Sequence, residues 1–104
     1  MYTNETTLIG FIRPPRSAKP YLIEFDGKEI ASLETVIVTG QSRSLHVPIY
    51  LTGEAIDEAR QWFDIRPEGF HARVEGTLVM YSEEVYVVVN YIKAREDRSW
   101  QRFE

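Results

Sequence analysis

The sequence contains no cysteine, and this absence removes several kinds of chemistry. A chain without thiols has no disulfide framework, no thiolate zinc site, no iron–sulfur cluster and no cysteine nucleophile. Long apolar runs are also missing, since the longest, residues 85–89, is about a quarter of the length that a membrane-spanning helix needs. The first residues lack a basic flank followed by an apolar stretch. We therefore expect no secretory signal, no membrane partner and a cytoplasmic protein.

The chain contains fewer basic than acidic residues. The chain has 12 Lys and Arg against 16 Asp and Glu, a net charge of -4, which gives no general attraction to phosphate. Residues 13–20 are a local exception, because three cations, Arg13, Arg16 and Lys19, lie there among prolines without any acidic residue. Residues 54–64 carry four acidic residues against Arg60 alone, a net charge of -3. Any binding of nucleic acid must therefore depend on local groups of cations.

Sequence motifs for catalysis are absent as well. The chain has no nucleophile elbow, no phosphate-binding loop and no dinucleotide fingerprint. Its two histidines, His46 and His71, lack the spacing of zinc ligands. Glu83 and Glu84 are neighbours in the chain, so on a strand they would point to opposite sides. We expect no catalytic residues, no metal site, no cofactor and no enzymatic activity.

The length and the composition are those of one folded domain. With 104 residues, 43% hydrophobic and 27% charged, the chain is large enough for one core and too small for two. We expect a single domain over residues 1–93. The extension, residues 94–104, has no clear period, and both a helical and a disordered form stay open for it.

Hydrophobic periodicity predicts most of the secondary structure. Alternating patterns indicate five strands, over residues 7–12, 29–39, 45–51, 71–80 and 85–92. Residues 21–25 look extended, and the Asp26-Gly27 pair after them indicates a hairpin or a sharp bend. Between the third and fourth strands the apolar residues follow a helical stripe, with Thr52 as the expected cap and Pro67 beyond the end.

This order predicts the fold class. Three strands, a helix and two strands are the elements of the five-stranded Greek-key OB barrel, and about 100 residues is its usual size. We therefore predict a mainly β fold with one helix, closed as an OB-fold barrel. An open α+β sheet would give similar periodicity and stays open as an alternative.

Several short motifs carry a family resemblance. They are Leu8-Ile9-Gly10 before a proline-bearing turn, Asp26-Gly27 before Ile30-Ala31-Ser32-Leu33, Gly53 opening the helix, Pro67-Glu68-Gly69-Phe70 before residues 74–78, and the valine-rich residues 85–92. In this order, residues 7–92 resemble the bacterial single-stranded DNA-binding protein (SSB) family. The resemblance implies an OB fold, sequence-tolerant binding of single-stranded DNA, and dimers or tetramers. One departure is Leu45, which stands before His46 where the family usually places a stacking tryptophan.

A single-strand binder needs cations for phosphates and aromatic rings for bases. The candidate cations are Arg13, Arg16 and Lys19 in the proline-rich loop, Arg43 in the turn before the third strand, and Arg73 on the polar side of the fourth. Tyr50 alternates with core residues and should point outward, where it can stack a base. The orientations of Tyr21, Phe25 and Tyr81 stay open, Tyr86 is expected in the core, and Trp62 and Phe63 are expected to plug the barrel end.

Two functions follow from this pattern. The first is a homo-oligomeric SSB-like protein that binds single-stranded DNA in replication, repair or recombination, with replication proteins among its partners. The alternative is an OB-fold module for protein interaction or oligomerisation, or a primosome-type accessory replication protein, with weak or no DNA binding. The mild acidity and the replaced tryptophan favour this alternative. Salt dependence separates the two, because phosphate contacts make affinity fall steeply with salt.

Overall fold

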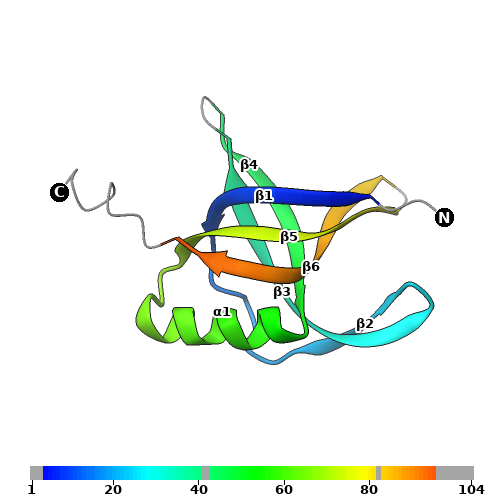
Figure 1. Cartoon of the computed structure of the whole chain (residues 1–104), viewed down its shortest axis with the longest axis horizontal. Helices are drawn as coiled ribbons and strands as arrows, with labels where there is room; N and C mark the ends of the chain where they lie inside the picture. The colour runs from blue at the N-terminus through cyan, green and yellow to red at the C-terminus, as the bar shows by residue number, and fades with distance from the viewer. Residues whose placement is uncertain (1–3, 41–42, 82, 96–104) are drawn as a thin grey trace.

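The computed structural model describes residues 4–40, 43–81 and 83–95, with the side chain of Tyr81 left out (Figure 1). The predicted strands and helix all form. The elements are β1 (Glu5–Ile12), β2 (Tyr21–Phe25), β3 (Lys28–Thr39), β4 (Leu45–Thr52), α1 (Glu54–Ile65), β5 (Phe70–Tyr81) and β6 (Glu84–Ala94). Most of the predicted extension, from residue 96 onward, lies outside the described residues.

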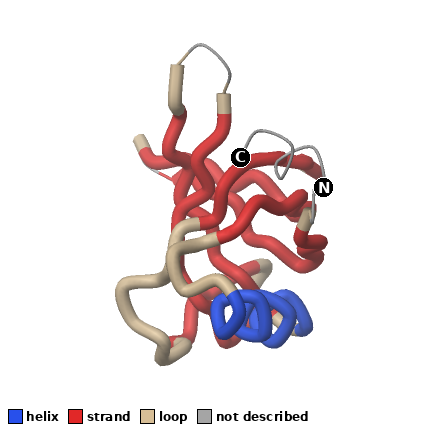
Figure 2. The backbone as a smooth tube through the Cα atoms, turned by 90° about the vertical axis from the view of Figure 1, so that its left-hand side faces the viewer, coloured by secondary structure: helices blue, strands red, loops and turns tan. Residues whose placement is uncertain are grey.

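Five of the strands close into a ring. β1 pairs with β5 along its whole length and with β3 at Phe11 and Ile12. β5 pairs with β6, β6 runs parallel to β4, and β4 pairs with β3, which completes the circuit. α1 lies at one end of this ring (Figure 2). The predicted barrel with a helix between its third and fourth strands is therefore confirmed.

The predicted number of strands is too low by one. Residues 21–25 form a separate strand, β2, which pairs only with the first part of β3, from Tyr21 opposite Ser32 to Phe25 opposite Lys28. Asp26 and Gly27 connect them with positive φ values of 54° and 76°. Such a two-residue turn matches the twist of paired strands and favours a hairpin over a bend. β2 therefore lies beside the ring as an added arm.

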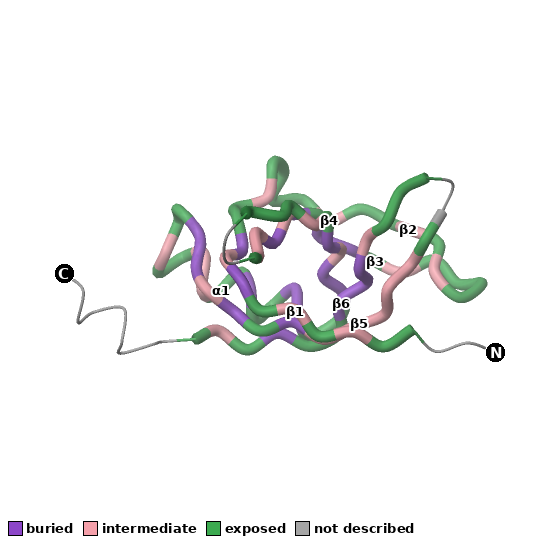
Figure 3. Tube along the Cα trace, turned by 90° about the horizontal axis from the view of Figure 1, so that it is seen from above, coloured by how far each residue is buried: buried purple, intermediate pink, exposed green. Residues whose placement is uncertain are grey.

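The buried residues, purple in Figure 3, lie mainly on the ring strands and α1, and their side chains form one hydrophobic core. Alternate residues of the five ring strands point inward, among them Ile37, Ile49 and Val87, which are almost fully buried. Trp62 and Phe63 of α1 pack against this core, with ring centroids 6.0 and 5.0 Å from that of Phe70. The prediction that these two rings plug the barrel end is confirmed.

The expected helix cap is wrong. Thr52 does not cap α1, because its hydroxyl Oγ1 donates to the carbonyl oxygen of Val89, 2.8 Å away, and so ties β4 to β6. The helix begins after Gly53 without a side-chain cap. Thr52 is the last residue of β4 and is buried, so its hydroxyl lies beside the neighbouring strand β6 and bonds to it instead of to the helix backbone.

Gly76 allows the ring to close tightly. A Cβ atom built on Gly76 would lie 2.0 Å from the carbonyl oxygen of Val88, closer than any side chain can come. The pairing of β5 with β6 shifts between Glu75 and Gly76, which marks a bulge at this point.

No helix in residues 4–40, 43–81 and 83–95 is both long and apolar enough to cross a membrane.

Candidate nucleic-acid interface

Three tyrosines from three strands form a row on the outer face of the barrel. Tyr50 stands between the buried Ile49 and Leu51 of β4, so its side chain points outward as predicted. The Tyr50 ring centroid lies 5.0 Å from that of Tyr86 on β6 and 6.5 Å from that of Tyr21 on β2. Both contacts are edge-to-face, at 73° and 84°. We call Tyr21, Tyr50 and Tyr86 the tyrosine row.

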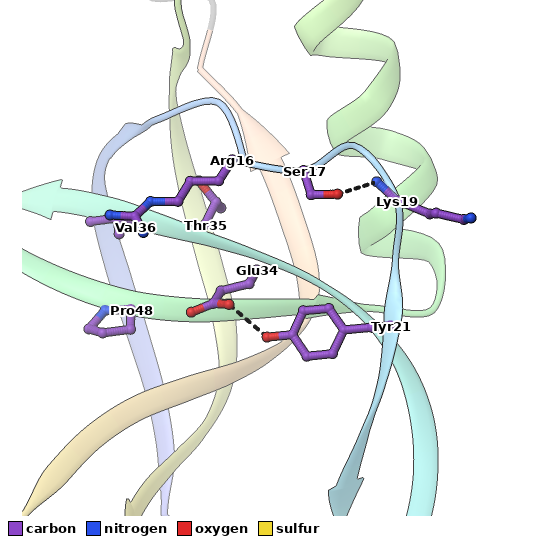
Figure 4. A pocket seen from close by; sticks show the side chains of 8 residues that line it. All are labelled: Arg16, Ser17, Lys19, Tyr21, Glu34, Thr35, Val36 and Pro48. Atoms are coloured by element: carbon purple, nitrogen blue, oxygen red, sulfur yellow. Dashed lines mark hydrogen bonds between the residues drawn. The ribbon is translucent and has the colours of Figure 1, made fainter.

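A carboxylate lies beside the tyrosine row. Glu34 of β3 is paired with Tyr50 in the strand register, and its Oε1 accepts a hydrogen bond of 2.6 Å from the hydroxyl of Tyr21 (Figure 4). Burial, followed by the hydrogen bond to Glu34, raises the pKa of Tyr21 above its ordinary value. The Tyr21 hydroxyl therefore keeps its proton and acts as the donor. Burial and the charge of Glu34 raise the pKa of Tyr50 in the same direction.

Two hollows adjoin along this face. The first, about 300 Å³, is lined by Arg16, Lys19, Tyr21, Glu34, Val36 and Pro48 among others. The second, about 310 Å³, is lined by Glu34, Pro48, Tyr50, Glu84, Val85 and Tyr86. Glu34 and Pro48 line both, so the two hollows are adjacent. Together they extend over β2, β3, β4 and β6, and we call the pair the tyrosine groove. Its two cations, Arg16 and Lys19, are matched by two carboxylates, Glu34 and Glu84.

The proline-rich loop borders one end of the tyrosine groove. Its backbone is held there, because the N–H of Arg13 donates to the carbonyl oxygen of Val36 at 3.0 Å and the hydroxyl of Thr35 donates to the carbonyl oxygen of Arg13. Farther along, the guanidinium of Arg60 on α1 donates to the carbonyl oxygen of Ala18 at 3.0 Å. A basic loop fixed in this way can present its side chains to a ligand in the groove.

The three cations of the loop are placed differently. Arg16 extends across the groove toward Val36, whereas the side chain of Lys19 points away from Glu34 and Pro48 (Figure 4). Arg13 is exposed and does not line the groove. Arg16 is therefore the predicted cation whose side chain is directed along the groove wall, at the loop edge.

Arg43 and Arg73 are not brought to the tyrosine groove. Arg43 is exposed in the turn before β4, and Tyr50 lies farther along that strand, roughly 17 Å beyond Leu45 at the rise of an extended chain. Arg73 lies on β5, where its Nη2 is 2.6 Å from the Oε2 of Glu75. β5 is separated from β4 by β6 in the ring. Arg73 points outward as predicted, but on another side of the barrel.

The positions of Tyr86 and Leu45 remain to be described. The prediction that Tyr86 lies in the core is wrong. Its side chain is half-buried on the outer face, because the inward positions of β6 belong to Val87 and Val89. Leu45 is 55% exposed, and it alternates in phase with Val47 and Ile49 rather than with Tyr50. It therefore lies on the opposite side of β4 from the tyrosine row.

Sequence reasoning missed Glu34 as a site residue. The alternation of residues 29–39 already groups Glu34 with Ser32 and Val36 on one face of a strand. The alternation does not give the strand register, which places Glu34 beside Tyr50 and within reach of Tyr21.

In the part of the chain that the structure describes, no group of three or more His, Asp or Glu side chains is placed to hold a metal ion.

Comparisons with known proteins establish the fold. No protein-family model matches the chain, and a comparison with curated proteins finds no match. Among solved structures, the mitochondrial single-stranded DNA-binding protein Rim1 from S. cerevisiae is similar over 90% of this chain and 95% of its own, with a TM-score of 0.65 and 14% identity. The fold is an OB barrel of the SSB type.

Two other solved structures are similar at the same level. The second single-stranded DNA-binding protein of Mycobacterium smegmatis matches over 95% of this chain and 93% of its own, with a TM-score of 0.59 and 18% identity. The dimeric N-terminal domain of PriB from Thermoanaerobacter tencongensis matches over 90% and 98%, with a TM-score of 0.53 and 16% identity. At these identities the likeness concerns the SSB-type barrel, and the arguments for function come from the tyrosine groove.

Proposed function

We propose that this protein binds single-stranded DNA in the tyrosine groove and acts in replication, repair or recombination. The observation that carries the proposal is the tyrosine row on the outer face of an SSB-type barrel, with Arg16 at its edge. Rings of this kind stack on bases, and a neighbouring cation attracts the phosphates. The similar yeast and mycobacterial proteins are named for binding single-stranded DNA, which supports the same assignment.

The arrangement favours single strands over duplexes. In a duplex the base faces are covered by their neighbours, whereas in a single strand they are free to stack on the tyrosine rings. Adjacent rings in the row are nearly perpendicular, so they cannot hold successive bases in one continuous stack. We expect neighbouring bases to contact different rings. The proposed function includes no chemical step and no cofactor.

The charges in the groove set its salt dependence. Each phosphate contact contributes a slope of roughly 0.7 to the plot of log affinity against log salt on single strands. With Arg16 and Lys19 as the cations that line the groove, we expect a slope of about 1.4. Glu34 and Glu84 oppose this attraction, so the stacking contacts must supply much of the affinity.

A titration with DNA tests the proposal. Fluorescence anisotropy of a labelled single strand of mixed sequence, about 30 nucleotides long, would be followed at low and high salt against a matched duplex and a matched RNA. We expect single-strand binding with a shallow salt slope, and weaker binding to the duplex. Tyr86→Ala should weaken binding, whereas Tyr91→Ala, on the same strand outside the groove, should not. Absence of binding at low salt would rule the proposal out.

The second candidate is a protein-interaction or oligomerisation module, or a primosome-type accessory protein. Glu34 and Glu84 in the groove favour it, since carboxylates repel phosphates. Exposed apolar side chains on two hairpins also favour it, namely Leu22 at 62%, Met80 at 74% and Val85 at 42%. A homo-oligomer, either a dimer or a tetramer, is compatible with both functions, and analytical ultracentrifugation measures its size. Oligomers without any DNA binding would select this second candidate.

A further inference from the structure

A carboxylate, Glu34, lies in the middle of the proposed DNA site. A carboxylate repels phosphates, so its presence there is not explained by binding of the DNA backbone alone. Glu34 lines both hollows of the tyrosine groove and is the paired neighbour of Tyr50. The described part of the chain shows no ion pair to Glu34. Its negative charge therefore faces whatever enters the groove.

The hydrogen bond from Tyr21 fixes one oxygen of this carboxylate and leaves room for a ligand. An ionised carboxylate has about four acceptor positions. Tyr21 occupies one of them, at Oε1, with a distance of 2.6 Å. The remaining positions on Oε1 and Oε2 can accept further hydrogen bonds, because Glu34 is an exposed residue that lines both hollows. Tyr21 thus positions the carboxylate of Glu34, which can only accept hydrogen bonds, beside the rings of the tyrosine row.

Resting on the proposed function, we propose that Glu34 reads the Watson–Crick edge of a guanine stacked in the tyrosine groove. Single-stranded bases on aromatic platforms are recognised through hydrogen bonds on their edges. Guanine alone presents two adjacent donors there, N1–H and the N2 amino group, which match the two oxygens of a carboxylate. Adenine and cytosine present one amino group beside an acceptor nitrogen, and thymine presents one N–H between two carbonyl oxygens. Those acceptors are repelled by Glu34.

The same charge directs the strand. Phosphates avoid Glu34 and Glu84 and are attracted to Arg16, which extends from the loop at the groove edge. Bases therefore turn toward Glu34 and the tyrosine row, while the backbone follows the loop side. In this arrangement one residue supplies selectivity and another supplies attraction.

Inosine provides the sharpest test, because it is guanine without the N2 amino group. Three thymidine oligonucleotides, each about 20 nucleotides long, would carry isolated guanine, inosine or adenine at the same positions. The matched variants are Glu34→Gln, which keeps the size and removes the charge, and Glu29→Gln. Glu29 lies on the same strand an odd number of residues away, so it points to the opposite face.

We expect the wild-type protein to bind the guanine strand roughly fivefold more tightly than the inosine strand, because the bond lost is to a charged group in a groove open to solvent. Adenine should bind no better than inosine. Glu34→Gln should bring the guanine-to-inosine ratio close to one, whereas Glu29→Gln should leave it unchanged.

The outcomes separate the two proposals. Equal binding of guanine and inosine strands by the wild-type protein would overturn the assignment of Glu34 and leave single-strand binding intact. So would a Glu34→Gln variant that binds all three strands more tightly by the same factor, because Glu34 would then act only as a repulsive charge. Failure of every strand to bind at low salt would instead refute the proposed function itself.

Discussion

Replacement of Tyr50 by alanine tests the stacking surface most directly. Tyr50 is the middle ring of the tyrosine row, in edge contact with Tyr86 at 5.0 Å and with Tyr21 at 6.5 Å. One base stacked on an aromatic ring contributes roughly 1–3 kcal/mol to binding of a single strand. The Tyr50 ring is half-buried between its neighbours, so part of its surface is already covered. We therefore expect a loss near the lower end, about tenfold in affinity.

The salt dependence makes this prediction specific. A tyrosine ring carries no charge that pairs with phosphate, so Tyr50→Ala should lower the affinity and leave the salt slope unchanged. Anisotropy titrations at several salt concentrations measure both quantities. Tyr50→Phe keeps the ring and removes the hydroxyl, and we expect its affinity to stay close to that of the wild-type protein.

Stability has to be measured alongside. Each aromatic pair contributes about 0.5–1.5 kcal/mol beyond its buried area, and Tyr50 takes part in two of them. Urea unfolding therefore accompanies each titration, to show that Tyr50→Ala is folded under binding conditions. A folded variant that binds as tightly as the wild-type protein would refute the stacking model. An equal loss in Tyr91→Ala, whose ring lies outside the groove, would refute it as well.

Three further predictions follow from the same structure. Gly76→Ala should lower the free energy of unfolding by roughly 1–3 kcal/mol in urea titrations, because its Cβ would meet the carbonyl oxygen of Val88; unchanged stability would contradict the close approach. Arg16→Ala should lower the salt slope of DNA binding by about 0.7, while Arg73→Ala, on another side of the barrel, should not; an effect of Arg73 alone would move the site. Folding raises the pKa of the Tyr21 hydroxyl above its ordinary value of 10.0, so the folded protein keeps the hydroxyl proton at a pH where the unfolded chain has lost it. The free energy of unfolding should therefore fall as the pH rises above 10.0. Tyr21→Phe should make that fall shallower above about pH 10, as measured by urea midpoints, and an identical fall in both proteins would contradict the raised pKa.

The prediction of the fold from the sequence succeeded where local periodicity carries the information. Alternation marked the five barrel strands, and the stripe from Ala55 to Phe63 marked α1. It could not decide the state of residues 21–25, because Asp26-Gly27 suits both a bend and a hairpin. The decision came from β3, which is long enough to pair with β2 before it enters the ring.

The candidate site was predicted in part, for the same reason. Tyr50 and the basic loop were found, since outward orientation and charge can be read within one segment. Thr52 was assigned to the wrong element, because its partner Val89 belongs to a strand that is remote in sequence. Tyr86 was assigned to the core, because in a run of apolar residues the sequence does not show which alternate positions face inward.

By itself, the sequence determined which residues share one face of a strand or helix, because the period of each element is fixed by local backbone geometry. Only the tertiary structure decided which outward-facing residues from different strands meet. Strand register and ring closure bring Tyr21, Glu34, Tyr50 and Tyr86 into one groove and carry Arg73 to another side of the barrel. Register depends on packing between segments that are far apart in the chain, and no local pattern specifies it.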